Sequence, residues 1–296
     1  MASSEQKQDI PQIQFDSGTN NTLGLEIVPI EKIAKHKNHY NHNPESPHQL
    51  SFYNLIFFTE GKGRHFIDFE WHPVQQNSLL YLAKDQINAF DFSENLQGFC
   101  IIFTEEYFIN CFANLPEDFV FRLFTPQLFC PVVQIPATSD FNDYFIALKK
   151  EVEVKGSFIQ PTITAALFTV LVSKAEEVVH NHTSHLKNSS QIKFLHQFNS
   201  LIETNFSKSR SAQFYAKEMA VTYKHLNEVC TTVLGRTAKT IIDDFVILQA
   251  KRNLINSTIK STELAYKIGF KDPTNFTKYF KKSTGFTPKE FSKSFI

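Results

Sequence analysis

Residues 265–291 read AYKIGFKDPTNFTKYFKKSTGFTPKEF, and residues 216–241 read AKEMAVTYKHLNEVCTTVLGRTAKTI, which is nearly the same pattern about fifty residues earlier. The copies align at an offset of 49 before the turn, where Ala216 matches Ala265, and at 50 after it, where Gly235 matches Gly285. Each copy predicts a short helix, a turn of about four residues and a second helix with one apolar face. This is the outline of a helix-turn-helix, whose second helix enters the major groove of DNA.

The segment between the copies, residues 238–257, contains neither glycine nor proline, and its apolar residues recur at helical spacing. We therefore predict one continuous helix there. At ~1.5 Å per residue, about twenty residues span ~30 Å. Because a turn of B-DNA is ~34 Å long, two recognition helices held this far apart fit successive major-groove segments on one face of the duplex.

The second copy has the clearer turn chemistry. Gly269 can end a helix in the left-handed conformation, Asp272 can cap the next helix, and Pro273 suits its first turn. Residues 191–296 resemble the DNA-binding domain of the AraC/XylS family of bacterial transcription regulators on these motifs. The resemblance implies double-stranded DNA as a partner, a cytoplasmic location, and RNA polymerase as a candidate partner.

The family pattern also implies which side chains face DNA. In the first unit these are Thr222, Tyr223, Lys224, His225, Asn227, Glu228 and Thr231, and in the second they are Thr274, Asn275, Thr277, Lys278, Lys281 and Lys282. Asn can pair with adenine, Glu can accept from cytosine, and Lys can reach guanine or phosphate. Near the next helix starts lie Lys239 and Lys289, for which a plain surface role is the alternative.

Charge separates the two halves of the chain. Residues 187–296 hold 18 Lys and Arg against 8 Asp and Glu, whereas residues 1–186 hold 12 against 22, so the formal net charge of the whole chain is zero. Within the repeat, residues 271–285 have a net charge of +3 and residues 221–235 a net charge of zero. We expect the second unit to supply more of the phosphate affinity and the first more of the base discrimination.

The front half predicts a β-rich domain. From about Leu23 to Phe108, short apolar runs alternate with turns, and Gly61-Lys62-Gly63 reads as a hairpin connection. The order is similar to the cupin-type sensor domain of many AraC-type regulators. The expected class is an α+β two-domain chain, in which a cupin-like β-barrel or jelly roll with a helical segment precedes an all-α domain of two helix-turn-helix units joined by a long helix.

The expected domain boundaries follow from these patterns. We expect a loose polar tail over residues 1–22, a sensor and dimerisation domain over 23–182 with helices from about residue 139, a linker over 183–190, and the DNA-binding domain over 191–296. In the resembled family, helices such as those expected at 139–154 and 159–182 often pair two subunits. We expect a homodimer or a monomer–dimer equilibrium, and a lid on the barrel is the competing interpretation.

Metal chemistry is not expected in the barrel. Where cupin-type domains often carry three histidines and a glutamate, this chain has His48, Leu50, Asn54 and Asn88. One ligand of four does not hold an ion. We predict no metal, no other cofactor and no enzyme activity. A second histidine cluster, at His36, His39 and His42, is surrounded by Asn and Pro and reads as a solvated loop.

A small-molecule effector in the barrel is expected, although a filled, ligandless core is an equal alternative. The candidate ligand-binding residues are Phe52, Phe57, Tyr81 and Phe103. The leading function is a sequence-specific transcription regulator, with activation as the working expectation, since the sequence does not separate activation from repression. The alternatives are a cupin-type enzyme tethered to DNA and a DNA-binding dimer that senses nothing.

Nothing in the sequence predicts secretion or a membrane. The first 21 residues are polar and include acidic side chains, and the longest apolar run, around Ala165 to Val172, is too short to cross a bilayer. The four cysteines show no CxxC spacing, which is typical of reduced thiols in the cytoplasm.

Overall fold

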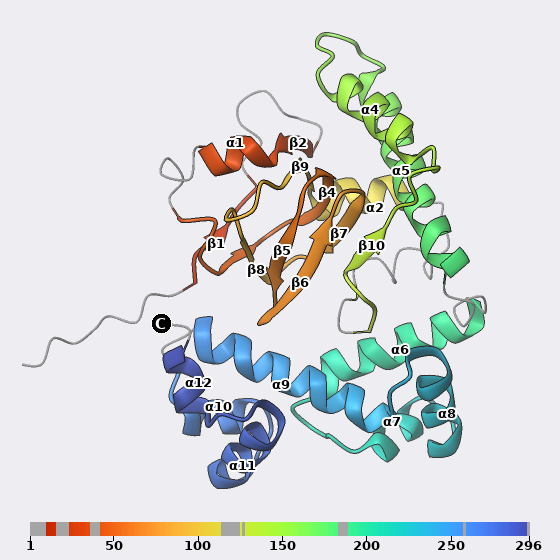
Figure 1. Cartoon of the computed structure of the whole chain (residues 1–296). Coiled ribbons are helices and arrows are strands. Elements are labelled where there is room, and N and C mark those ends of the chain that lie inside the picture. Colours follow the sequence, from red (N-terminus) through yellow and green to blue (C-terminus); the bar gives the residue numbers. More distant parts are fainter. Residues whose placement is uncertain are drawn as a thin grey trace, which may run out of the picture. The chain divides into compact units, whose positions relative to one another are not determined.

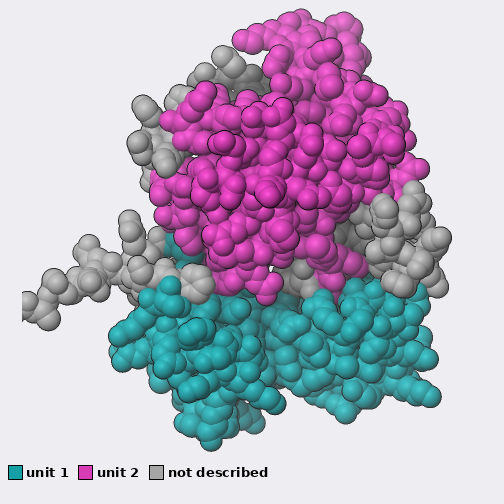
Figure 2. Space-filling view, in the orientation of Figure 1, with its two compact units in different colours: residues 1–10, 188–296 teal, residues 11–187 magenta. Residues whose placement is uncertain are grey.

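The computed structural model describes residues 10–15, 24–35, 42–113, 125, 128–182, 189–256 and 259–294. The chain divides into two compact units, one of residues 11–187 and one of residues 188–296 together with residues 1–10 (Figure 2). We call them the front unit and the helical unit. Within the described part of the chain, no helix is both long enough and apolar enough to cross a bilayer.

The front unit contains two five-stranded sheets (Figure 1). The first sheet has the order β1-β3-β8-β5-β6, formed by Gln12–Ile13 (β1), His48–Leu50 (β3), Ile87–Phe90 (β8), Lys62–Ile67 (β5) and Glu70–Gln75 (β6). The second has the order β10-β7-β4-β9-β2, formed by Val132–Gln134 (β10), Ser78–Leu82 (β7), Tyr53–Glu60 (β4), Gln97–Phe103 (β9) and Leu25–Pro29 (β2). Neighbouring strands are antiparallel, except that β1 runs parallel to β3.

Strand β4 shows how the second sheet separates two cores. Successive side chains of a strand point to opposite faces, and β4 is buried on both. Ile56 and Phe58 join a cluster that both sheets share, so this core lies between the sheets. Leu55 and Phe57 join a second cluster with residues of helices α2, α4 and α5. One face of β4 therefore packs between the two sheets, and the other face packs against helices α2, α4 and α5.

Four helices of the front unit have described bounds: Ile30–Lys35 (α1), Glu105–Phe112 (α2), Phe141–Val152 (α4) and Gln160–His182 (α5). Thr104 caps α2, because its Oγ1 accepts a hydrogen bond from the N–H of Tyr107 at 3.1 Å. The helical segment expected from about residue 139 corresponds to α4 and α5, and both contribute to the core on the outer face of the second sheet. This agrees with the expected β-rich front domain.

The predicted hairpin at Gly61 is wrong. Strand β4 ends at Glu60 in one sheet and β5 begins at Lys62 in the other, while β5 pairs with β6 instead. Gly61 has φ +84°, and a Cβ there would lie 2.5 Å from the carbonyl oxygen of Asn95. Glycine is needed for this crossing, and a turn signal in the sequence does not say which sheet the next strand joins.

The expected loose tail does not extend over the whole of residues 1–22. Gln12–Ile13 form β1, whose register with β3 pairs Ile13 with Leu50. The ring of Phe15 packs edge-on against Phe52 with centroids 6.0 Å apart. Burial of these two apolar side chains holds the segment on the sheet. Residues 1–9 and 16–22 of this expected tail, and 183–188 of the expected linker, lie outside the described residues, and Ser189 already begins helix α6.

The helical unit consists of seven helices within its described residues (Figure 1). They are Ser189–Asn205 (α6), Ala212–Glu218 (α7), Tyr223–Leu234 (α8), Ala238–Asn256 (α9), Ser261–Lys267 (α10), Pro273–Thr284 (α11) and Pro288–Ser294 (α12). Helix α9 is the predicted linking helix, and its 19 residues give it a length of about 28 Å. Two helix-turn-helix units, α7–α8 and α10–α11, are therefore joined as the repeat predicted.

Candidate nucleic-acid interface and front-unit cavity

Helix α8 is the second helix of the first helix-turn-helix unit, the place that a recognition helix occupies in this motif. It begins after Thr222, whose Oγ1 accepts a hydrogen bond from the N–H of His225 at 3.1 Å, and it ends at Gly235 with φ +65°. Leu226, Val229 and Cys230 are buried. This leaves a polar outer face, as the amphipathic pattern requires.

Helix α11 is its counterpart in the second unit. Asp272 caps it by accepting a hydrogen bond from the N–H of Thr274 at 2.7 Å, Pro273 occupies the first turn, and Gly285 ends it with φ +81°. Phe276 and Phe280 are fully buried. Both copies thus have a side-chain cap at the helix start, a left-handed glycine at the helix end and a buried apolar face, while their exposed residues differ.

Most of the predicted DNA-facing side chains are exposed to solvent. In the first unit these are Thr222, Tyr223, Lys224, His225, Glu228 and Thr231, and in the second they are Thr274, Asn275, Lys278, Lys281 and Lys282. Lys239 and Lys289 are exposed as well, whereas Asn227 and Thr277 are half-buried. The hydroxyl of Thr277 donates to the carbonyl of Pro273 at 3.0 Å. The ring of His225 packs against Phe194 of α6, with centroids 5.4 Å apart.

Asn227 has a structural contact that the sequence did not reveal. Its Oδ1 accepts a hydrogen bond from the N–H of Ala238 at 3.2 Å, at the first residue of α9. The N–H groups of the first turn have no partner within a helix, so a side-chain acceptor there stabilises the helix start. In the second copy the matching residue is Pro288, which has no N–H, and the residue matching Asn227 is Thr277.

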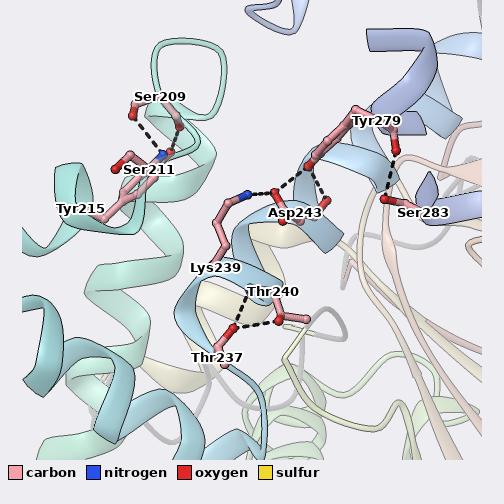
Figure 3. Close-up of polar contacts among 9 residues, drawn as sticks. All are labelled: Ser209, Ser211, Tyr215, Thr237, Lys239, Thr240, Asp243, Tyr279 and Ser283. Atoms are coloured by element: carbon pink, nitrogen blue, oxygen red, sulfur yellow. Dashed lines mark hydrogen bonds and ion pairs between the residues drawn. The ribbon is translucent and has the colours of Figure 1, made fainter. Parts of the chain in front are cut away.

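A polar network ties α11 to α9 beside Lys239 (Figure 3). The hydroxyl of Tyr279 donates to Oδ1 of Asp243 at 2.7 Å, and the ammonium of Lys239 pairs with the same oxygen. Burial and the neighbouring Asp243 raise the pKa of Tyr279, so its hydroxyl stays protonated and donates. Lys239 therefore faces a local countercharge, unlike a lone basic side chain.

The loop after α6 braces the second unit. The guanidinium of Arg210 lies 3.6 Å from the ring centroid of Phe270 and donates to the carbonyl of Gly269 at 3.3 Å. A Cβ on Gly269 would lie 1.8 Å from the carbonyl oxygen of Ser207. These contacts join segments about sixty residues apart, and no periodicity in the sequence predicts them. They fix the turn from which α11 begins.

The front unit contains a cavity of about 490 Å³. Residues of both sheets line it, including Ile13 of β1, and so do residues of helix α1. His48 and Asn88 are paired directly across β3 and β8 of the first sheet, and Asn54 belongs to the second. These three residues and Leu50 occupy the four positions compared with a cupin metal site, and all four line this cavity. The fold brings the four positions together, but with side chains unlike those of a metal centre.

The buried polar groups of the cavity are uncharged. Desolvation lowers the pKa of His48 to about 4, although Nδ1 contacts the carbonyl of Ser46 at 3.0 Å, which acts in the opposite direction. Burial raises the pKa of the Cys100 thiol to about 12. Beside the cavity, His65 is also buried, and desolvation lowers its pKa to about 3 against the opposing effect of Asn88. At neutral pH these side chains act as dipoles and not as ions.

The four candidate ligand-binding residues are divided between the two cores. Phe52 lines the cavity. Phe57, Tyr81 and Phe103 belong to the cluster with α2, α4 and α5, on the other face of the second sheet. Both faces of this sheet are apolar, so alternation in the sequence separates two sets of side chains without saying which set borders a cavity.

The histidines do not assemble a metal site in the described part of the chain, where no group of three or more His, Cys, Asp or Glu could hold an ion. His42 lines the cavity and its ring lies 4.7 Å from that of His48. His36 and His39 lie outside the described residues. The predicted histidine loop is therefore represented here by His42 alone.

Each of the two units matches a known domain family. Residues 30–151 match the family model of the AraC-like ligand binding domain, and residues 215–294 match that of the helix-turn-helix domain. A helix-turn-helix transcriptional regulator in the cgkA 5' region of Pseudoalteromonas carrageenovora is 31% identical over 94 residues, which cover 32% of this chain and 55% of that protein. The lactose operon transcription activator of Staphylococcus xylosus is 27% identical over 94 residues, covering 32% of this chain and 34% of that protein.

These matches place an AraC-like ligand binding domain in the front unit and a helix-turn-helix domain in the helical unit, which is the domain order of AraC-type transcription regulators. The chain spans about half the length of the first of these relatives and about a third of the second. Among solved structures, ToxT from Vibrio cholerae is similar over 91% of this chain and 98% of that one, with a TM-score of 0.46 and 11% identity.

Proposed function

We propose that this chain is a sequence-specific DNA-binding transcription regulator whose front unit binds a small molecule. The observation that carries the first part is the pair of recognition helices, α8 and α11, held on one linking helix about 28 Å long. That length is close to the ~34 Å turn of B-DNA. The exposed basic residues of α11 support contact with phosphates.

Selection of bound sequences from random DNA tests this function. We expect one conserved site in which two recognised segments lie about one helical turn apart, because each recognition helix reads its own part of the groove. A variant with glutamate at Lys278, Lys281 and Lys282 serves as the control and should recover no site. Binding of the native chain to all sequences alike would contradict the proposal.

The cavity between the sheets supports the small-molecule part of the proposal. Its volume of about 490 Å³ lies within the ~300–1,000 Å³ that is usual for small-molecule sites. We place no catalysis there, because His48 is the only ionisable residue among the four positions compared with a cupin metal site. Elemental analysis of the purified chain tests this directly, and stoichiometric iron, zinc or manganese would favour a DNA-tethered enzyme instead.

We also propose that a second copy of the chain packs on α4 and α5. Several apolar side chains of these helices and the loop between them are exposed, among them Ile146, Val154, Phe158, Ile159 and Ile163. Exposed apolar residues that cluster in this way are typical of association surfaces. Sedimentation of the native chain and of a Phe158→Ser/Ile163→Ser variant measures this, and equal masses at all concentrations would contradict it.

We also propose that the chain acts in the cytoplasm and that RNA polymerase is one of its partners. A regulator that binds chromosomal DNA acts in the cytoplasm of a bacterium, and an activator contacts RNA polymerase or assists its binding. Transcription in vitro from a promoter that carries the selected site distinguishes activation, which we expect, from repression.

A further inference from the structure

We propose that the cavity takes an uncharged, mainly apolar molecule that donates a hydrogen bond, such as a phenol, an alcohol or a neutral amide. The inference rests on the proposed small-molecule function of the front unit and adds the chemical class of its ligand. It depends on three properties of the wall: its apolar surface, the absence of a charge among the buried polar side chains, and two hydrogen-bond acceptors.

The apolar surface comes from both sheets and from the N-terminal segment. Ile13 and Phe15 contribute from one side, and Val28, Phe52 and Phe90 contribute from the others. Contact with such side chains favours a ligand that is apolar over most of its surface, because water is released from both partners.

Two hydrogen-bond acceptors lie on the same wall, and the first of them has no partner among the described residues. Asn54 is buried, and among the described residues its Oδ1 accepts no hydrogen bond. The ring of His48 contacts a carbonyl oxygen through Nδ1, and since a carbonyl only accepts, this nitrogen carries the proton. Nε2 of the neutral ring is then an acceptor. A buried acceptor without a partner is costly, and a ligand that donates a hydrogen bond removes this cost.

Charge argues against an ionic ligand. His48, Asn54, Asn88 and Cys100 are buried and neutral, as the lowered pKa of the imidazole and the raised pKa of the thiol require. The charged residues in the described lining are Glu26 and Lys32, which have opposite signs and are not buried. A carboxylate or ammonium group inside would lose its hydration without a net countercharge.

A substitution of Asn54 distinguishes a ligand held by a hydrogen bond from one held by apolar contacts alone. Asn54→Leu keeps a similar volume and removes an amide that lacks a partner for its oxygen. The variant also loses the hydrogen bond between the amide and the Cys100 thiol, so we expect it to fold about as stably as the native chain in the absence of ligand. It should also lose the preference for hydrogen-bond donors while it keeps the apolar contacts.

The test uses the full chain and a fragment set of matched quadruplets: phenols, their methyl ethers, the corresponding carboxylates, and the corresponding amines. Binding is measured by ligand-observed NMR at pH 7.5, followed by titration of the hits. Val28→Phe, which narrows the cavity from a half-buried position, identifies the fragments that occupy it. Circular dichroism confirms that both variants fold.

We expect the fragments displaced by Val28→Phe to be mostly phenols, which bind about tenfold or more tightly than their ethers. Asn54→Leu should bring the two classes to within about twofold of each other. Carboxylates or amines that bind as well as phenols, or a phenol preference that persists in Asn54→Leu, would overturn the inference. If no fragment depends on the cavity, the proposed small-molecule function itself fails, which is a distinguishable result.

Discussion

The Oδ1 atom of Asn227 lies 3.2 Å from the backbone nitrogen of Ala238 and accepts its hydrogen bond. A side chain on the recognition helix of the first unit thus caps the start of the linking helix α9. Asn227, which the family pattern places toward DNA, therefore contributes to the geometry of the helical unit.

Asn227→Ala should lower the free energy of unfolding of the helical unit by about 1 kcal/mol, the usual cost of a lost N-cap acceptor. Affinity for the selected DNA site should fall at all base pairs alike. Urea unfolding and binding to single-base variants of the site measure the two effects. Asn227→Asp keeps an acceptor and should restore most of the stability. A loss confined to one A·T pair would assign Asn227 to base readout instead.

Lys281→Ala should flatten the salt dependence of DNA binding with little change in sequence preference. Each phosphate contact that is removed lowers the slope of log K against log salt by about 0.9. Lys239→Ala is the matched control, and we expect a smaller change because Lys239 pairs with Asp243. A selective loss at one base pair in Lys281→Ala would contradict the assignment to phosphate.

The residue at the turn differs between the two units, so we expect substitutions there to change the free energy of unfolding in opposite directions. Both preceding helices end with the same backbone hydrogen bonds, Val221 N–H to Ala216 and Phe270 N–H to Ala265, at 2.9 and 2.8 Å. The left-handed residue is Ala220 in the first copy, with φ +55°, and Gly269 in the second, with φ +86°. Only glycine adopts this conformation without strain.

Ala220→Gly should therefore raise the free energy of unfolding by about 1 kcal/mol, because Ala220 is exposed and its methyl group makes no buried contact. Gly269→Ala should destabilise the helical unit by more than about 2 kcal/mol, since its Cβ would meet the backbone of Ser207. Thermal unfolding of both variants measures this. Equal and small changes would indicate that the loop after α6 moves away from Gly269.

Acid should destabilise the front unit. The pKa of His48 is lowered from 6.5 to about 4 and that of His65 to about 3, in surroundings that include His42, His72 and Asn88. Between pH 6.5 and these values the unfolded chain binds protons that the folded chain does not. The free energy of unfolding therefore falls as the pH falls through this window, by on the order of 2 kcal/mol per histidine between pH 6.5 and pH 5.

Urea unfolding followed by the fluorescence of Trp71, the only tryptophan of the chain, measures this effect in the front unit. The midpoint should be lower at pH 5 than at pH 7.5, and His65→Gln should reduce the difference. An unchanged midpoint over this range would show that the imidazoles gain protons without unfolding.

The helical unit was predictable from the sequence because its signals are local. The left-handed glycines 235 and 285 and the cap at Asp272 act within a few residues, so spacing alone placed α8 and α11. The brace formed by Arg210 and Phe270 was not predictable, since it joins residues about sixty positions apart with no shared period.

The sequence predicted that the front unit is rich in β-strands, but it did not predict which strands pair with one another. Alternation and turns indicated short strands, yet Gly61 proved to carry the chain between sheets. For the same reason the candidates Phe57, Tyr81 and Phe103 lie on the helix-covered face and only Phe52 lines the cavity. The resemblance to a cupin-type domain located His48, Asn54 and Asn88 more successfully than the aromatic pattern did, because it fixes positions in space.

Pro288 affects which residues of the two helix-turn-helix units can be substituted without loss of stability. Since Pro288 offers no N–H, Thr277 is not needed as a cap for the following helix, whereas Asn227 in the first copy is. A substitution at Thr277, one of the predicted DNA-facing residues, therefore carries no penalty at the next helix start. At this one position, the second unit is therefore freer to vary than the first.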